Sequence, residues 1–164
     1  MDSAVTHLAI GLGEFAVSRD PGTSMVAYGL GSCIGVALFD PEVGVGGMIH
    51  VVLPTAPAEQ EVRNPTRFAD TGIQFLLREM ERLGARRRRI RSKIAGGARM
   101  FEVNHAPALD IGNRNWQAVR ENLGRLGLPL VGEDVGGNYG RTMHFFLKDG
   151  QVLITTYGRG EKIL

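Results

Sequence analysis

The spacing of apolar and polar positions predicts a chain built mainly from strands. Short runs rich in β-branched and other apolar residues, bounded by glycine, proline or serine, are typical of strands. The runs are "HLAIGLGEFAVS", "SMVAYGL", "CIGVALFD", "GGMIHVVLP", "RIRSKIAGG", "LPLVGED", "RTMHFFL" and "QVLITTY". Between the last two runs, Lys148-Asp149-Gly150 is a sequence that favours a hairpin turn.

Two segments have the period of a helix instead. From about Thr66 to Leu83, apolar residues recur at every third or fourth position, and Gly84 follows as a stop signal. The second helix is expected over residues 112–127, with Asn113 as its N-cap and one apolar face formed by Trp116, Val119, Leu123 and Leu126. Two amphipathic helices need a sheet to cover, so the pattern predicts an α+β layered sandwich with mostly antiparallel strands, in one domain over residues 1–164.

Composition narrows the class of protein. Of the 164 residues, 43% are hydrophobic and 22% are charged, as in a soluble globular domain. Cys33 is the only cysteine, which excludes an internal disulfide, and no apolar run approaches the roughly 18 residues of a membrane span. The start of the chain lacks the features of a secretory signal. We therefore expect a cytoplasmic protein without membrane insertion.

Positive charge is concentrated in the segment "RLGARRRRIRSK". Arg86 to Arg89 are expected to follow the first helix and lead into an exposed strand edge, where charge opposes aggregation. Aromatic side chains that could stack on bases are not interleaved with this cluster. Nucleic-acid binding is therefore not expected.

The lone cysteine has two interpretations. A single intracellular cysteine is commonly a small buried apolar residue. Here, however, Cys33 lies among Gly29, Gly31 and Gly35, and glycines allow a sharp bend and the close approach of another molecule. In such a bend the backbone N–H groups at Gly31 and Ser32 are candidates for binding an oxyanion.

A histidine follows at a suitable spacing. If the strands around Pro41-Glu42 form an antiparallel hairpin, Cys33 lies directly opposite His50, with Cβ atoms about 4.5–5.5 Å apart. An imidazole at that distance can take the thiol proton, whereas a slip of one residue would turn His50 to the other face. The histidines are dispersed along the chain, so neither a metal site nor a cofactor is expected: His7, His50, His105 and His144.

Five motifs in order add a family resemblance: "GLGSCIGV", "HVVLP", "KIAGGARMF", "IGNRN" and "EDVGGNYGR". From about Gly11 to Lys162 this series resembles the CheD family, the chemoreceptor glutamine deamidases of bacterial chemotaxis. The resemblance implies that Cys33 is the nucleophile and His50 the base, in a fold similar to that of a deamidating toxin. It implies glutamine side chains on the cytoplasmic helices of chemoreceptors as substrates, with receptor methyl esters as a second substrate.

One position departs from the family. Where relatives have a threonine that orients the histidine, this chain has Ala27, and we expect the Ala27 backbone carbonyl to orient His50 instead. Asn113 and Arg114 are expected either to hold substrate or to serve as capping and surface residues. Phe101 is expected to be either a core residue or an exposed partner contact.

Two classes of function follow from these residues. The first is an amidohydrolase, a protein-glutamine glutaminase that acts through a thioester on Cys33 without a metal. The second is a non-catalytic chemotaxis adaptor that binds receptors or the phosphatase CheC. The Cys33 and His50 pair favours the enzyme, and the alanine at position 27 favours the adaptor.

Overall fold

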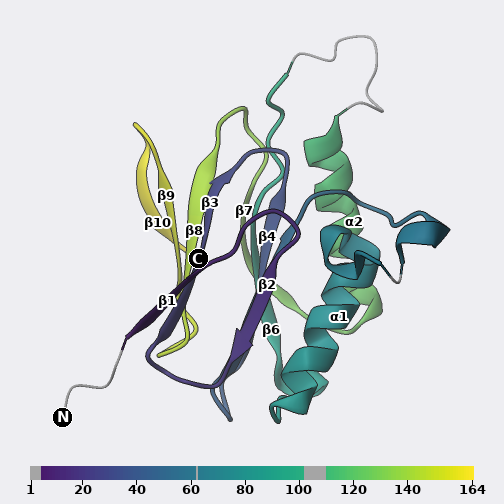
Figure 1. The fold of residues 1–164 in the computed structure, drawn as a ribbon. Coiled ribbons are helices and arrows are strands. Elements are labelled where there is room, and N and C mark those ends of the chain that lie inside the picture. The colour runs from purple at the N-terminus through teal and green to yellow at the C-terminus, as the bar shows by residue number, and fades with distance from the viewer. Residues whose placement is uncertain (1–4, 62, 102–109) are drawn as a thin grey trace.

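The computed structural model describes residues 5–61, 63–101 and 110–164, and in these residues ten strands form two five-stranded sheets (Figure 1). The first sheet has the order β1 (Thr6–Ala9), β3 (Thr23–Leu30), β8 (Arg141–Phe146), β9 (Val152–Thr156) and β10 (Gly160–Ile163). The second has the order β2 (Phe15–Ser18), β5 (Val45–Val51), β4 (Ile34–Asp40), β6 (Arg91–Gly96) and β7 (Leu130–Val135).

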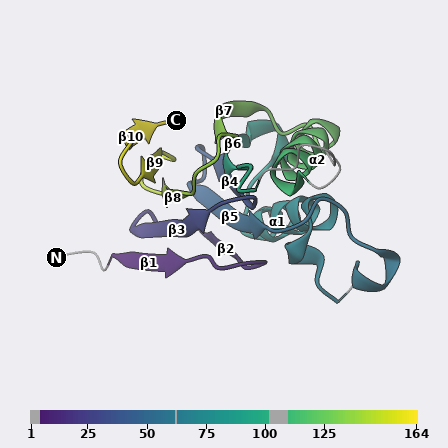
Figure 2. The same ribbon diagram turned by 90° about the horizontal axis from the view of Figure 1, so that it is seen from above.

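The sheets and helices form three layers. Figure 2 shows the first sheet on one side, the second in the middle, and helices α1 (Ala69–Arg82) and α2 (Ile111–Arg125) on the far face of the second sheet. The β1–β3 and β6–β7 pairs are parallel, and the other ladders are antiparallel. Short 3-10 turns are η1 (Ala58–Gln60), η2 (Pro65–Arg67) and η3 (Arg87–Arg89). The predicted α+β layered fold with mostly antiparallel strands is confirmed.

Each interface between layers contains a core. The helices bury their apolar stripes against the second sheet, in a cluster that includes Ile34, Val36, Ile49, Ile73, Leu76, Val119 and Leu123. A separate cluster fills the space between the sheets and includes Met25, Ala27, Leu30, Met48, Met143 and Phe145. Alternate residues of β4 and β5 therefore belong to different cores, as the two faces of a strand require.

Both predicted helices are present, but α1 begins at Ala69 and not near Thr66, because Pro65–Arg67 forms the turn η2 and Phe68 is extended. Gly84 follows α1 with a φ of 103°, the left-handed conformation that commonly ends a helix. The prediction of Asn113 as N-cap is wrong, because the Asp110 side chain caps α2 and accepts a hydrogen bond from the Asn113 N–H at 3.2 Å. A carboxylate at this position also suits the positive end of the helix dipole. Within the described ranges, neither helix is long and apolar enough to cross a membrane.

Three strand predictions need correction. The first predicted run divides into β1 and β2, which belong to different sheets. β10 was not expected, because its sequence "GEKI" lacks an apolar alternation. β6 lies inside its sheet between β4 and β7, so the arginines before it do not lead into a strand edge. One of them, Arg89, is instead held against the buried carboxylate of Asp40 at 2.9 Å.

Candidate active site

The β4–β5 hairpin carries both predicted catalytic residues, but its register differs from the predicted one. Gly35 pairs with His50, so the prediction that Cys33 lies directly opposite His50 is wrong. Cys33 precedes the first residue of β4 and is diagonal to His50, two residues out of register. Diagonal neighbours on one face are about 7–8 Å apart, still within reach of long or aromatic side chains.

The loop of this hairpin explains the shift. Asp40 pairs with Val45, and the N–H of Gly44 donates to the Asp40 carbonyl at 3.0 Å. Gly44 has a φ of 68°, which closes a longer loop than a two-residue turn. A two-residue turn beginning at Pro41 would need a positive φ there, and proline cannot adopt one.

A shift of two residues preserves the face. Because side chains alternate with a period of two, His50 still projects from the same side of the sheet as Met48, into the core between the sheets. Cys33 packs against that same inter-sheet core and is half-buried. The structure therefore places the thiol and the imidazole on one face, as predicted, with His50 only 4% exposed.

The imidazole of His50 is oriented by a backbone carbonyl, but not by the predicted one. His50 Nδ1 lies 2.9 Å from the carbonyl oxygen of Ile10, so the prediction that Ala27 orients His50 is wrong. The cause is the crossing of the chain from β1 to β2, which brings Ile10 beside β5. Ala27 lies in the middle of β3, where it pairs with Met143 of β8.

This contact fixes the tautomer of the imidazole. A carbonyl oxygen only accepts, so Nδ1 of His50 carries the hydrogen and Nε2 carries the lone pair. Nε2 is buried and has no hydrogen-bond partner among the described residues. A buried nitrogen with a free lone pair on the face that holds a cysteine can act as a base.

The bend at Cys33 is fixed by three successive carbonyl groups. The carbonyl of Gly31 accepts from the Ala98 N–H at 2.8 Å, and the carbonyl of Cys33 accepts from the Gly97 N–H at 2.9 Å. Between them, the carbonyl of Ser32 accepts from the side-chain amide of Asn115 at 2.9 Å. The motifs "AGGARM" and "IGNRN" thus meet at the cysteine.

Two glycines make this close packing sterically feasible. A Cβ atom on Gly96 would lie 2.0 Å from the Cys33 carbonyl oxygen, and Gly96 has a φ of 117°. A Cβ atom on Gly112, in the first turn of α2, would lie 2.2 Å from the carbonyl oxygen of Ala98. Only glycine allows the backbone to approach so closely at both positions.

Electrostatics leave the thiol protonated at rest. Burial raises the pKa of the Cys33 thiol, and the positive charge of Arg67 offsets only part of this effect. A thiolate is the reactive form of a cysteine. Proton removal from Cys33 therefore depends on a base close to the site.

The other predicted site residues divide into two groups. Gly31 and Ser32 belong to the bend itself, whereas Asn113 and Arg114 are exposed in the first turn of α2. Phe101 is 82% exposed, so it is not a core residue. With Ser32 and Met100 it lines a hollow of about 150 Å³ next to the bend.

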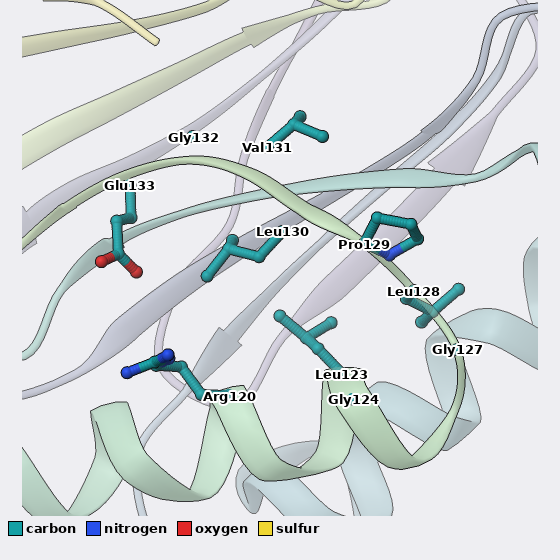
Figure 3. Close-up of a pocket in the computed structure, with 10 residues that line it drawn as sticks. All are labelled: Arg120, Leu123, Gly124, Gly127, Leu128, Pro129, Leu130, Val131, Gly132 and Glu133. Atoms are coloured by element: carbon teal, nitrogen blue, oxygen red, sulfur yellow. The ribbon is translucent and has the colours of Figure 1, made fainter.

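A larger hollow lies away from these residues. It has a volume of about 670 Å³ and lies between the C-terminal half of α2 and β7. Figure 3 shows Leu123 and Leu130 lying between the helix and the strand, with Arg120 and Glu133 at one end. None of the predicted catalytic residues lines it, and its lining holds no cysteine, serine, threonine or histidine.

Over the described ranges, no three histidine, cysteine, aspartate or glutamate side chains are grouped so that they could hold a metal ion. His105, one of the four histidines in the sequence, lies outside the described residues.

Sequence reasoning missed two residues of this site. The contribution of Ile10 comes from its backbone, and a carbonyl group leaves no trace in the residue type. Asn115 could have been noticed, because it is a polar residue one turn before Val119 on the apolar face of α2. A buried amide on such a face commonly has a specific hydrogen-bonding role.

Comparison with solved structures supports the fold alone. The crystal structure of Neisseria meningitidis protein NMB0706, of the DUF152 family, has a TM-score of 0.54 and 11% identity. The match covers 89% of this chain and 71% of that one.

Comparison with sequences identifies the family. The family described as "CheD chemotactic sensory transduction" matches residues 52–156. A Symbiobacterium thermophilum protein named "Probable chemoreceptor glutamine deamidase CheD" is 48% identical over 93% of this chain and 94% of its own length. A Caldanaerobacter subterraneus protein of the same name is 43% identical over 96% and 97%. This chain belongs to the CheD family.

Proposed function

We propose that this protein deamidates glutamine side chains of chemoreceptors in the cytoplasm, with Cys33 as nucleophile and His50 as base. The observation that carries the proposal is the state of His50. Its Nδ1 is held by the Ile10 carbonyl, while its buried Nε2 has no partner in the described part of the chain. An oriented imidazole with a free lone pair, on the face that holds the only cysteine, is suited to activating a thiol.

The first half-reaction forms a thioester. His50 Nε2 takes the proton of the Cys33 thiol as the sulfur attacks the carbonyl carbon of the glutamine amide. The carbonyl oxygen becomes an oxyanion, for which the N–H groups of the Gly31–Cys33 bend are the candidate donors. His50 then gives its proton to the amide nitrogen, the carbon–nitrogen bond breaks and ammonia leaves.

The second half-reaction restores the enzyme. His50 removes a proton from a water molecule, which attacks the thioester carbon. The carbon–sulfur bond breaks, Cys33 recovers its proton from His50, and glutamate is released. A receptor methyl ester would react by the same steps with methanol as the leaving group, so methylesterase activity is compatible with this site.

The raised pKa of the thiol refines this mechanism. Since burial favours the neutral form of Cys33, proton removal occurs together with attack on the substrate. His50 therefore acts as a general base rather than as the partner of a preformed thiolate.

A second candidate function concerns partner binding. Met100 and Phe101 are 46% and 82% exposed and line the hollow beside Ser32. Adjacent exposed apolar side chains are typical of a contact surface. This observation favours docking of a protein partner, such as a receptor helix or a CheC-type phosphatase, beside the catalytic bend.

Intact-mass analysis of receptor cytoplasmic fragments tests the enzymatic proposal. Each deamidation adds about one dalton, the difference between an amide and an acid. We expect the wild-type protein to increase the mass of the fragments, and Cys33→Ala and His50→Ala to leave it unchanged.

His144→Ala is the matched control. His144 is a half-buried histidine of β8 that contacts Thr155 at 3.4 Å, so its loss should leave deamidation at the wild-type rate. Deamidation by folded Cys33→Ala would overturn the assignment of the nucleophile. Receptor fragments whose mass does not change after incubation with the wild-type protein would favour the adaptor.

A further inference from the structure

Asn115 has an unusual position for a polar residue. It lies on the inner side of the first turns of α2 and is completely buried. Its side-chain nitrogen donates to the carbonyl oxygens of Ser32 and Val52, each at 2.9 Å. Because both partners only accept, the network fixes which end of the amide is nitrogen.

These two carbonyls flank the candidate catalytic residues. Ser32 immediately precedes Cys33, and Val52 follows His50 by two residues. The β4–β5 ladder ends at the pair of Ile34 with Val51. One side-chain nitrogen therefore joins the two chains just beyond the last pair of the ladder, where strand ends otherwise separate most easily.

We propose that Asn115 is a positioning residue, which sets the distance between Cys33 and His50 by tying together the two strand ends that carry them. The inference rests on the proposed function of those residues. An error of about 1 Å in the placement of reacting groups can reduce a rate about 100-fold. The two hydrogen bonds of Asn115 therefore act directly on the distance between Cys33 and His50.

The oxygen of the Asn115 amide supports a functional role for this side chain. Asn115 Oδ1 is buried and has no partner within the described ranges. A buried polar atom without a hydrogen bond lowers stability, and this cost offsets part of the stabilisation from the two donated bonds. The two bonds to the strand ends are therefore weak grounds for a purely stabilising role of Asn115.

The same helix provides a matched control. Asn122 is also buried, at 8% exposure, but its nitrogen donates to the Ala118 carbonyl of its own helix at 2.8 Å. Its oxygen accepts from Arg125, also at 2.8 Å. Asn122 is therefore a buried asparagine on α2 whose side-chain bonds stay within the helix and do not reach the bend.

The experiment compares Asn115→Ala and Asn122→Ala in the full chain. The first measurement is the rate of Cys33 alkylation by iodoacetamide as a function of pH, without substrate. The second separates kcat from KM for deamidation of receptor fragments. Thermal unfolding reports the stability of each variant.

We expect Asn115→Ala to reduce kcat by roughly 10- to 100-fold with KM nearly unchanged, and to slow alkylation at neutral pH. Asn122→Ala should lower Tm while both rates stay at the wild-type level. Wild-type kcat and alkylation in Asn115→Ala would overturn the inference. So would an equal loss of kcat in Asn122→Ala at an equal loss of Tm.

Two further arms keep the test decisive. If Asn115→Ala is not recovered folded, Asn115→Asp keeps the shape but cannot donate when ionised, and Asn115→Ser keeps one short donor. Because a serine hydroxyl has one hydrogen and cannot join both carbonyls, wild-type kcat in either variant overturns the inference. If deamidation by the wild-type protein does not depend on His50, the proposed function itself fails, whereas a His50-dependent kcat that is unchanged in Asn115→Ala overturns this inference alone.

Discussion

The buried polar groups at the two ends of β4 differ in their hydrogen bonding. At the C-terminal end, the carboxylate of Asp40 is completely buried and fully bonded, accepting from the N–H groups of Glu42 and Arg86 and from the Arg89 guanidinium. At the N-terminal end, beside Cys33, the buried atoms His50 Nε2 and Asn115 Oδ1 have no partner among the residues described.

The pKa values differ in the same sense. Burial acts to raise the pKa of Asp40, but hydrogen bonds from Arg89 and from two backbone N–H groups outweigh it, so the pKa lies below its ordinary value. At the other end, burial raises the pKa of the Cys33 thiol. One end therefore stabilises a charge in the resting protein, and the other keeps its nucleophile neutral.

This difference indicates that the Asp40 end of β4 stabilises the fold, whereas the Cys33 end carries the reactive groups. A fully bonded buried carboxylate holds the hairpin loop to the segment after α1. Unpaired buried polar atoms lower stability, and they are commonly found where a substrate completes the bonding. One strand can serve both purposes because its ends are separated by the rigid central ladder with β5 and β6.

Removal of the carboxylate should have the largest effect on stability. We expect Asp40→Ala to reduce the free energy of unfolding by about 3–5 kcal/mol, because it removes the buried acceptor of the Arg89 guanidinium and leaves the Arg86 and Glu42 N–H groups without their partner. Urea denaturation measures this loss. The kcat of the folded fraction should stay within about threefold of wild type, since the change lies at the end of β4 opposite to Cys33.

Glu42→Ala is the control for this variant. Glu42 contacts the same Arg89 at 3.3 Å, but its side chain is 69% exposed. An exposed ion pair contributes about 1 kcal/mol or less. An equal loss of stability in both variants would contradict the contrast between the two ends of the strand.

The pH dependence of the unfolding free energy should report Asp40 at acid pH and Cys33 at alkaline pH. Both effects should be smaller than the effect of Asp40→Ala. Because the pKa of Asp40 is lowered in the folded state, its contribution is present above the ordinary carboxyl pKa and is lost as the pH falls through the lowered value. Because the pKa of Cys33 is raised, its contribution is present below the ordinary thiol pKa and is lost as the pH rises through the raised value.

The free energy of unfolding, measured across the pH range, checks the direction of both changes. Asp40→Asn should flatten the acid side of the stability profile and leave the alkaline side as in wild type. Cys33→Ala should do the reverse. A variant that flattens the wrong side would refute the corresponding assignment.

The smallest effect is expected at Ala27. This side chain is completely buried between the sheets, and it lies 3.8 Å from where a Cβ atom on Gly35 would be. We expect Ala27→Thr to change kcat by no more than about tenfold, because the Ile10 carbonyl already orients His50. The added volume should destabilise the protein by about 1 kcal/mol.

Steady-state kinetics of deamidation with Ala27→Thr checks this expectation. A gain of several hundredfold would mean that the native site lacks an orienting group. It would also favour the adaptor function over the enzyme.

Periodicity predicted most of the fold because it reflects local physics. The period of α1 and its glycine stop could be recognised from neighbouring residues, and so could the β8–β9 turn, where Gly150 has a φ of 78°. β10 could not be recognised, since its polar residues form a strand only by pairing with β9. Its strand conformation comes from its partner and not from its own propensity.

The sequence by itself determined the layered α+β fold, its two amphipathic helices and the glycine-rich surroundings of Cys33. These features follow from alternation and backbone sterics, which act over a few residues. Only the tertiary structure decided the register of the hairpin, the carbonyl that orients His50 and the inward position of Asn115. Each depends on segments distant in the sequence, and a backbone carbonyl such as that of Ile10 is chemically the same in every residue.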